Sequence, residues 1–536
     1  MLFKKCASYP SIALLTVPLV ALAMEAPADP PPLTATPAPL CAPLAASLDE
    51  SARVLLESFY RLRDNQPAWN DPARRQQLRE QLAQLGDDGL DPADYPVGAD
   101  EDVCADLEIS HSYLQALLHL RRGRLPPARG ERIWHAPEHL PADPYLGVLS
   151  VASVQPDIAR AFAASRPQQP QYRQLRSAYA AARQQPPAHW EPIAAGPLLK
   201  PQGTDARVPA LRARLAAEGY LASATSAEGN RLDNTTAAAL QRFQEQHGLK
   251  PDGILGPGSL AELNVDAQTR RDQLRVNLER LRRLADDLDQ ARVVINVAGA
   301  ELRVMDNGLE AWRTRTQVGR PERETPLLAA PLLRLTLNPT WTVPPTILRE
   351  DKLPAIRDDP GYLDQHQMSV YDRSGNLLDP NQVDWHNPGP IRLRQAAGSQ
   401  NPLGRVALRF DNPFAVYLHD TPSQALFDKS PRIFSSGCVR VEAVDNLLAW
   451  LLPPEELATV QARLATGKTQ SYRLSTPAPL LIAYWTVEAD AAGNLRYLPD
   501  IYSRDAALIA ALNAASRRLP RKPGSDGQTQ ETVVWN

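Results

Sequence analysis

The spacing of apolar residues changes near residue 292, and this change most strongly limits the folds open to the chain. Before it, apolar residues recur every three or four positions, as in "ESARVLLESFYRLR" at 50–63, which predicts amphipathic helices. After it they alternate, as in "ARVVINVAGAELRVMDNG" at 291–308, which predicts a hairpin that turns near Gly299. A chain of 536 residues is also too long for one core. We therefore expect a multidomain α+β protein.

The first residues have the pattern of an export signal. Lys4 and Lys5 precede a short apolar run at 11–23 that ends in Ala21-Leu22-Ala23, a small-x-small cleavage site. An uncleaved anchor is the alternative, but the run is short for a bilayer span. We predict a signal peptide at 1–23, an Ala/Pro-rich linker at 24–47 and a disordered polar tail at 516–536.

Export changes what the four cysteines imply. Cys6 would leave with the signal, and disulfides form in oxidising compartments. A Cys41–Cys104 disulfide is then plausible from parity alone. Cys438 remains as the odd thiol.

Between linker and tail the pattern predicts four units. These are a helical scaffold at 48–200, a small three-helix module at 201–266, a charged amphipathic connecting helix at 267–291 and a β-rich domain at 292–505. In the module, Asn234 is the expected cap of the helix that starts at Thr235. A mixed stretch at about 345–400 interrupts the strands, as a lid would. The net charge of −3 gives no reason to expect a nucleic-acid partner.

The strongest chemical signal is "FSSGCVR" at 434–440 together with "AVYLHD" at 415–420. Alternation in the second segment puts Tyr417 and His419 on the face away from the core. A helical pattern follows Cys438, so the thiol should lie just before a helix N-terminus, which favours the thiolate. Gly437 allows a tight turn, and N–H groups around 437–438 could stabilise an oxyanion.

From these residues alone, a buried inert cysteine and a nucleophile are equally good interpretations. A zinc site would need more ligands than His419 and Cys438, so we predict no metal. The segment Gly467-Lys468-Thr469 is not a phosphate loop, because the glycine required five positions earlier is Ala462.

A resemblance extends this interpretation. The order His419, Ser435-x-Gly437-Cys438-x-Arg440 resembles the signature of L,D-transpeptidases with a YkuD-type catalytic domain. The segments "NPTWTVPP" at 338–345 and "GSQNPLGRVALRF" at 398–410 resemble the large YcbB-like periplasmic members. The string "ALQRFQEQHGLKPDGILGPGSLAELN" at 239–264 is similar to peptidoglycan-binding domains. Many members have a second histidine where this chain has Ser436.

The resemblance implies a role for each site residue. Cys438 would be the nucleophile, and His419 the base, oriented by a backbone carbonyl near Asp420. Gly437 and Ser435 would support the oxyanion and the local backbone. Arg440 would hold the pocket or a stem-peptide carboxylate, with a structural ion pair as the alternative. The remaining substrate contacts would be Tyr417, Trp341, which core packing could equally explain, and Ser436, whose role stays open.

The implied reaction cross-links peptidoglycan in the periplasm. A tetrapeptide stem would acylate Cys438 at the bond between diaminopimelate and D-Ala, and a second diaminopimelate amine would accept the acyl group in a 3–3 link. No cofactor is required, residues 345–400 would cap the substrate, and carbapenems would acylate the same thiol. Other wall synthases are candidate partners. The alternatives are an L,D-carboxypeptidase that uses water as acceptor and a non-catalytic wall-binding scaffold.

Overall fold

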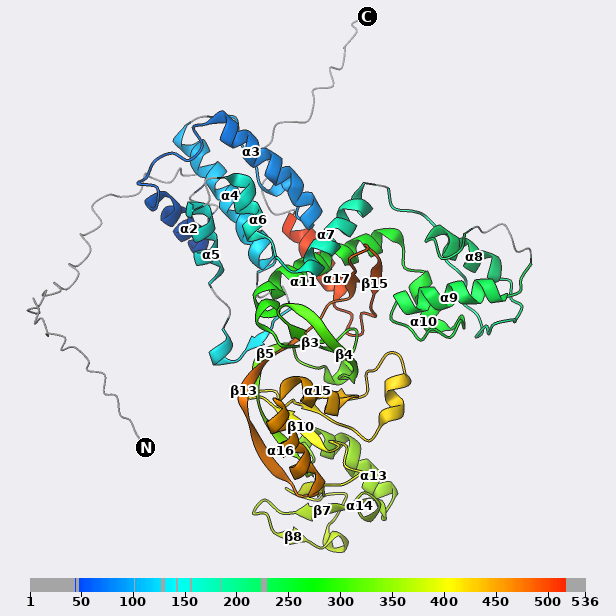
Figure 1. The fold of residues 1–536 in the computed structure, drawn as a ribbon. Coiled ribbons are helices and arrows are strands. Elements are labelled where there is room, and N and C mark those ends of the chain that lie inside the picture. Colours follow the sequence, from blue (N-terminus) through cyan, green and yellow to red (C-terminus); the bar gives the residue numbers. More distant parts are fainter. Residues whose placement is uncertain are drawn as a thin grey trace, which may run out of the picture.

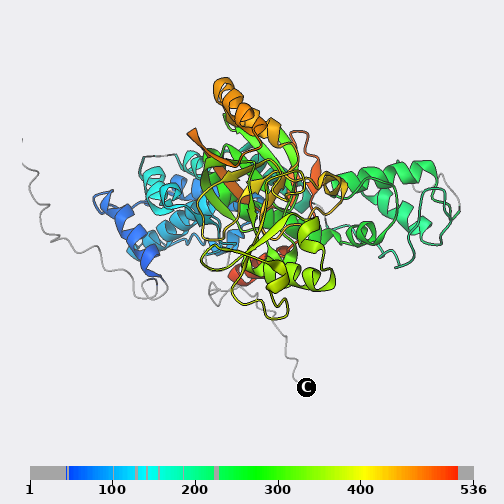
Figure 2. The same ribbon diagram turned by 90° about the horizontal axis from the view of Figure 1, so that it is seen from below.

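A computed structural model describes residues 44, 48–100, 102–126, 131–140, 143–154, 157–184, 186–222 and 229–516. The β-rich domain lies at the centre, with the scaffold helices at one end and the three-helix module at the side (Figure 1). Seen from below, scaffold and module extend in opposite directions from the barrel (Figure 2). The predicted signal peptide, all of the linker except Leu44, and the tail beyond 516 lie outside the described residues.

The scaffold is helical, as the sequence predicts. Its central helix, α4, carries thirteen buried residues. Inside the bundle, the Asp106 carboxylate accepts hydrogen bonds from the backbone N–H groups of Ala68 and Trp69. Cys104 is disulfide-bonded, and Cys41, its expected partner, lies outside the described residues. The helices are α2 (Glu50–Arg61), α3 (Pro72–Ala83), α4 (Val103–Arg122), α5 (Pro144–Val154), α6 (Ile158–Ser165) and α7 (Pro170–Arg183).

The module contains α8 (Val208–Ala217), α9 (Asn234–Gln246) and α10 (Pro257–Leu263) around one small core. The cap prediction was wrong by one residue. Asp233 caps α9 by accepting from the N–H of Thr236, and Asn234 is already helical. Both side chains can cap, so pattern alone does not choose between them. The connecting helix α11 (Ala267–Gln290) follows, as predicted.

The β-rich domain is a closed ring of eight strands. The order is β5-β10-β11-β12-β4-β3-β2-β13, and β13 pairs again with β5 to close the ring, while β1 (Trp134–His135) adds to β5. The predicted hairpin is β2–β3, with its turn at 297–300. The ring strands are β2 (Val293–Asn296), β3 (Glu301–Asp306), β4 (Leu309–Gln317), β5 (Leu328–Leu337), β10 (Val406–Arg409), β11 (Leu418–His419), β12 (Val439–Val441) and β13 (Gln470–Ala483).

The stretch expected to interrupt the strands forms its own small unit at the end of the barrel away from the scaffold (Figure 1). It has a four-stranded sheet, β6-β9-β7-β8, and a separate apolar core. Its elements are β6 (Trp341–Thr342), α12 (Pro345–Ile347), a π-helical turn η5 (Leu348–Lys352), α13 (Leu353–Asp358), α14 (Tyr362–Gln365), β7 (Met368–Tyr371), β8 (Leu377–Leu378) and β9 (Arg392–Gln395).

The remaining elements complete the barrel and its base. Two helices follow β12, namely α15 (Val444–Leu451) and α16 (Pro454–Ala465), and the hairpin β14–β15 (Val487–Ala489, Leu495–Tyr497) and helix α17 (Asp505–Ser516) pack near α11. Short 3₁₀ turns lie at Gln84–Asp88, Pro92–Asp94, Pro137–His139, Pro321–Arg323, Pro380–Gln382 and Gln424–Asp428. Within the described ranges, every helix is too short or too polar to cross a membrane.

Candidate active site

Strands β11 and β12 bring the predicted catalytic residues onto one face. They pair in parallel, with Leu418 opposite Val439 and His419 opposite Arg440, and Tyr417 accepts from the N–H of Val439 at 3.1 Å. Opposed residues of parallel strands point to the same side, and the side alternates along each strand. Leu418 and Val439 enter the barrel core. The other face carries Tyr417, His419, Cys438 and Arg440.

His419 is buried and held in one tautomer. Its Nδ1 lies 2.5 Å from the backbone oxygen of Asp420, which can only accept, so Nδ1 carries the proton and Nε2 is left as an acceptor. Burial, and then the positive charges of Arg440 and Arg409, lower the pKa of His419 to about 3. The imidazole is therefore neutral at neutral pH and able to take a proton through Nε2.

Cys438 is a free, half-buried thiol. Burial raises its pKa, although a backbone hydrogen bond from Tyr417 and the charges of Arg409 and Arg440 act in the opposite direction. The prediction of a helix directly after Cys438 was wrong. Strand β12 follows instead, and α15 begins six residues later, at Val444, so no helix terminus favours the thiolate here. The resting pair is a neutral thiol and a neutral imidazole.

The turn before Cys438 is fixed by Ser435. The Ser435 hydroxyl donates to the carbonyl of Cys438 at 2.5 Å and accepts from the N–H of Gly437 at 3.1 Å. Its backbone is tied to Val318 and Arg320, which anchors the turn to the end of β4. Gly437 has φ +110, a conformation that favours glycine. Because the Gly437 N–H is already bonded, it is not a ready oxyanion donor in this state, contrary to the expectation for the 437–438 pair.

Two arginines near the thiol have no carboxylate partner among the described residues. Arg440 donates to the side-chain oxygen of Gln317 at 3.1 Å, and its buried Nε has no hydrogen-bond partner there. Burial lowers the pKa of Arg440. Arg409, which the sequence analysis missed, lies 3.8 Å from the ring centre of Tyr417. The structural ion pair considered for Arg440 is not present in the described part of the chain, and the site carries uncompensated positive charge.

Tyr417 and Trp341 occupy different positions. The Tyr417 ring lies 5.6 Å from that of His419 and packs against both the barrel core and the core of the inserted unit. Trp341 is 9% exposed and belongs to the core of the inserted unit. The core-packing alternative for Trp341 is therefore the one the structure supports, and Trp341 stabilises the unit against which Tyr417 packs.

Ser436 leads to a contact that the sequence analysis did not anticipate. Its hydroxyl accepts from Arg323 at 2.9 Å. The same guanidinium donates to Asp351 at 2.9 Å and to Glu350 at 2.5 Å, both on the π-helical turn of the inserted unit. Arg323 thus connects the residue before Gly437 to the inserted unit. The partners lie 27 to 113 positions apart, so no local pattern could have indicated the link.

Comparisons with protein families match three segments of the chain. Residues 54–178 match a "Scaffold domain", residues 204–263 a "Putative peptidoglycan binding domain" and residues 290–469 an "L,D-transpeptidase catalytic domain". A Haemophilus influenzae protein named "Putative L,D-transpeptidase" is 36% identical over 240 residues, which are 44% of this chain and 48% of that protein. The chain thus spans about half the length of that relative.

Two solved structures were also found. One is an L,D-transpeptidase from Mycobacterium smegmatis, at 14% identity and a TM-score of 0.18 over 36% of this chain and 58% of that one. The other is an L,D-transpeptidase from Xylanimonas cellulosilytica, at 15% identity and a TM-score of 0.18 over 56% of this chain and all of that one. At these identities and TM-scores, neither structure bears on the fold or function of this chain.

Proposed function

We propose that this chain, which contains an L,D-transpeptidase catalytic domain and a peptidoglycan-binding domain, cross-links peptidoglycan stem peptides through a thioester on Cys438. One observation carries the proposal. A free thiol and a neutral imidazole with an open Nε2 lie on the same face of two paired strands. Such a pair performs acyl transfer without a cofactor.

In the first step, Sγ of Cys438 attacks the carbonyl between diaminopimelate and the terminal D-Ala of a tetrapeptide stem. Nε2 of His419 takes the thiol proton as the C–S bond forms and gives it to the departing amine of D-Ala as the C–N bond breaks. Because the two groups are neutral at rest, proton transfer accompanies attack and does not precede it. The product is a thioester.

In the second step, the side-chain amine of another diaminopimelate attacks the thioester. His419 takes a proton from that amine and returns one to the departing sulfur, so the enzyme is regenerated and a 3–3 link remains. Water in place of the amine would give the carboxypeptidase reaction instead. The backbone N–H of Cys438 and the phenol of Tyr417 are our candidates for stabilising the oxyanion in both steps.

The uncompensated charges of Arg440 and Arg409 support an anionic substrate. Free carboxylates occur in the stem peptide at diaminopimelate and at the terminal D-Ala. A guanidinium without an ion-pair partner beside the thiol is suited to bind one of them through charge-assisted hydrogen bonds. Arg440 is our first candidate for this contact, and Arg409 the second.

The proposal includes the predicted location and organisation. A substrate outside the cytoplasm agrees with a signal peptide at 1–23 and with action in the periplasm. The proposed domain limits are 48–200, 201–266, 267–291 and 292–505. The inserted unit, predicted at about 345–400, would cap the bound stem. Other wall synthases remain candidate partners.

The test compares the mature protein with its Cys438→Ala variant on muropeptides that carry tetrapeptide stems, read by mass spectrometry. We expect cross-linked dimers and released D-Ala with the mature protein, and neither with the variant. Tripeptide stems without dimers would replace the transpeptidase by the carboxypeptidase. No product from either protein would leave the wall-binding scaffold as the function.

A further inference from the structure

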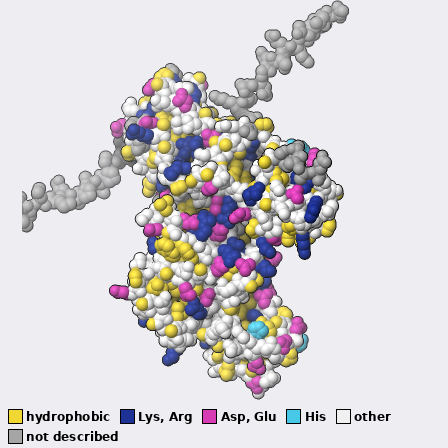
Figure 3. Space-filling view, turned by 45° about the vertical axis from the view of Figure 1, so that its right-hand side comes forward, with side chains coloured by type: hydrophobic (Ala, Val, Ile, Leu, Met, Phe, Trp, Pro, Cys, Tyr) yellow, Lys and Arg dark blue, Asp and Glu magenta, His cyan; other side chains and the backbone are white. Residues whose placement is uncertain are grey.

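A groove of about 1070 Å³ lies between the three-helix module and the barrel. One wall consists of module residues 218–220, 242, 245 and 246, and the other of the β3–β4 hairpin, with the β14–β15 hairpin and the start of α7 closing the ends. Basic and acidic side chains gather together across the middle of the face shown in Figure 3. Neither wall forms the groove alone.

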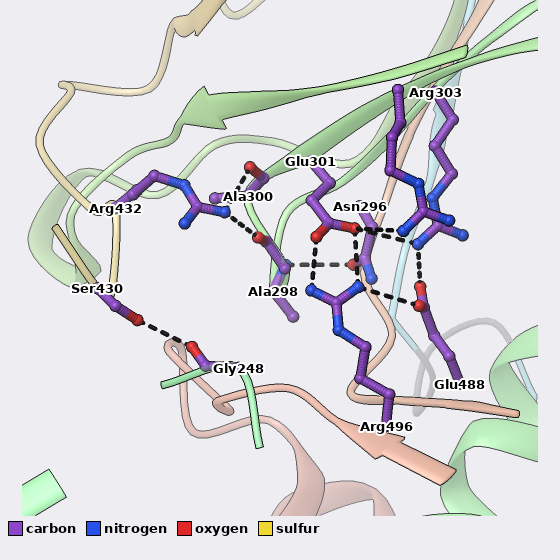
Figure 4. A network of polar contacts seen from close by, with 12 residues as sticks. Gly248, Asn296, Ala298, Ala300, Glu301, Arg303, Ser430, Arg432, Glu488 and Arg496 are labelled. Carbon is purple, nitrogen blue, oxygen red and sulfur yellow. Dashed lines mark hydrogen bonds and ion pairs between the residues drawn. The ribbon is translucent and has the colours of Figure 1, made fainter. Parts of the chain in front are cut away.

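The module is fixed against the barrel, so the groove keeps its shape. The His247 ring stacks on Tyr497 with ring centres 5.3 Å apart, and the Ser430 hydroxyl donates to the carbonyl of Gly248 at 2.8 Å. Beside this contact, Arg303 and Arg496 alternate with Glu301 and Glu488 in one ion-paired network (Figure 4). A ligand therefore meets a preformed surface.

The charges of the lining disfavour a polyanion. Six of the lining residues are acidic and four are basic, which leaves a formal charge of −2. The network also compensates its own charges. Although burial opposes it, the hydrogen bonds and charges of Arg496 and Arg303 lower the pKa of Glu301 to about 2, so its carboxylate stays ionised and paired. A neutral ligand suits this surface better than a nucleic acid or an acidic peptide.

The uncharged part of the lining indicates a carbohydrate. Side-chain amides of Gln171, Gln174 and Gln246 face the groove, and Nε2 of Gln171 is buried without a hydrogen-bond partner in the described part of the chain. Leu309, 65% exposed, and Tyr220 add apolar surface for the C–H faces of sugar rings. Hydroxyl and acetamido groups would satisfy the amides.

Strand β4 runs from this groove to the catalytic site. Arg313 is the lining residue of β4 nearest the site, and Gln317, four residues later, pairs with Arg440. Cys438 lies two residues further along the antiparallel strand β12, so about six strand residues, or about 20 Å, separate the groove from the thiol, whereas a fully extended tetrapeptide reaches only about 14 Å. A sugar held in the groove therefore cannot deliver its own stem peptide to Cys438. The reacting stem must belong to another unit of the polymer.

We propose that the groove binds the glycan backbone of peptidoglycan at a unit that is not the one reacting at Cys438. This rests on the proposed function for its reaction, but binding itself does not require Cys438. It follows that a long polymer, which can occupy the groove and the catalytic site together, gains from the groove, whereas a single soluble disaccharide-tetrapeptide does not.

The experiment uses the full mature chain and two substitutions in the groove, Leu309→Ser and the double variant Gln171→Ala/Gln174→Ala. Matched controls are Leu146→Ser, also at 65% exposure but on scaffold helix α5, and Gln76→Ala on α3. Two quantities are measured: co-sedimentation with isolated polymeric peptidoglycan in the Cys438→Ala background, and the ratio of turnover on polymer to turnover on the soluble fragment.

We expect the groove variants to lower both quantities at least fivefold and the controls to leave both unchanged. Groove variants that sediment like the parent would overturn the proposal. If sedimentation falls but no protein cross-links any substrate, the groove stands and the proposed function fails. Thermal unfolding of each variant separates lost binding from lost folding.

A different observation carries a second inference. Arg323 is 11% exposed at its side chain and joins Ser436, before the nucleophile turn, to Asp351 and Glu350 of the inserted unit. These acids lie on a π-helical turn, a feature common at functional sites. We infer that Arg323 is a positioning residue that couples the position of the inserted unit to the turn holding Cys438. The inference rests on the proposed function, since it concerns acylation of that thiol.

A double-mutant cycle tests this coupling. Ser436→Ala and Asp351→Asn are measured singly and together, in the parent and in an Arg323→Gln background, for the acylation rate of Cys438 by a carbapenem. We expect the effects to deviate from additivity at least threefold in the parent and to become additive without Arg323. Additive effects in both backgrounds would overturn the inference. A parent that is not acylated at all, with Cys438 intact, would instead count against the proposed function.

Discussion

The arginines of helix α11 and those of the catalytic face have opposite surroundings. Arg280 is bound by Glu131 at 2.9 Å and by Asp505 at 2.5 Å, and despite burial these charges raise the pKa of its guanidinium. Among the residues that the structure describes, Arg440 hydrogen-bonds to one side-chain amide and to no carboxylate, and burial lowers its pKa. The two side chains are both enclosed, yet only the first has its charge neutralised by the protein.

This difference in surroundings indicates that Arg280 holds the domains together and that Arg440 serves ligand binding. Glu131 lies between scaffold helices α4 and α5, and Asp505 starts α17, so the Arg280 network fastens two distant parts of the chain to helix α11. Because both carboxylates pair with Arg280, its guanidinium is not available to bind an added anion. The described part of the chain supplies no carboxylate to Arg440, which is the condition expected of a residue that binds a ligand carboxylate.

Removing either reacting group should have the largest effect. For Cys438→Ala and His419→Ala we expect cross-linking to fall at least about 1,000-fold, because nucleophile and base act as one unit. Stability should change little by comparison. Initial rates of dimer formation, with urea unfolding as the control, check this. A variant that keeps more than a tenth of the parent rate would contradict the assignment.

Breaking the α11 network should cost stability instead of chemistry. Arg280→Met strands two carboxylates, and we expect a loss of about 3–5 kcal/mol in the free energy of unfolding. The matched control is Arg334→Met, which breaks an exposed pair with Asp411 and should cost less than about 1 kcal/mol. Urea titration measures both. Equal losses in the two variants would mean that burial of the pair does not matter.

The opposite outcome is expected at Arg440. Arg440→Gln should slow acylation by a stem peptide about 10- to 100-fold, which corresponds to about 1.4–2.8 kcal/mol of charge-assisted bonding. Its unfolding free energy should stay within about 1 kcal/mol of the parent, because no carboxylate is stranded. Arg440→Lys should recover part of the rate. A large stability loss with unchanged acylation would make Arg440 structural, like Arg280.

The smallest effect concerns the resting thiol. Burial raises the pKa of Cys438, so the group should remain a protonated thiol at pH 7 and ionise only above the ordinary range for cysteine. Absorbance at 240 nm, taken as the difference from Cys438→Ala between pH 5 and 10, reports the thiolate. We expect no thiolate signal at pH 7. A signal already present at pH 6 would indicate a thiolate–imidazolium pair.

Long periodic segments were predictable, and short or distant contacts were not. Helix α11 carries its apolar stripe over 24 residues, and the β2–β3 hairpin has a clear turn, so local pattern sufficed for both. Strand β12 has three residues, too few for a period of two to be distinguished from the helix that follows. That is why Cys438 was expected at a helix terminus.

The residues of the candidate active site likewise fall into those that the sequence predicts and those that it does not. The order of His419 and Cys438, and the carbonyl of Asp420 on the imidazole, could be anticipated from the motif. Arg323 could not, because Ser436 lies 113 positions away in the sequence. Arg409 was missed because its contact with the Tyr417 ring depends on the pairing of β10 with β11. Trp341 shows the remaining difficulty, since an apolar residue in a strand can pack in a core or line a pocket, and only the tertiary structure decides.

The closed ring of strands also bears on self-association. An open sheet offers its unpaired edge to a second chain, whereas in the barrel β13 pairs with both β2 and β5, and no ring strand ends the sheet. The inserted unit differs, because its sheet ends in β6 and β8, each only two residues long. Edge-to-edge aggregation of the β-rich domain thus has few starting points, namely the short edges of the inserted unit, of β1 and of the β14–β15 hairpin.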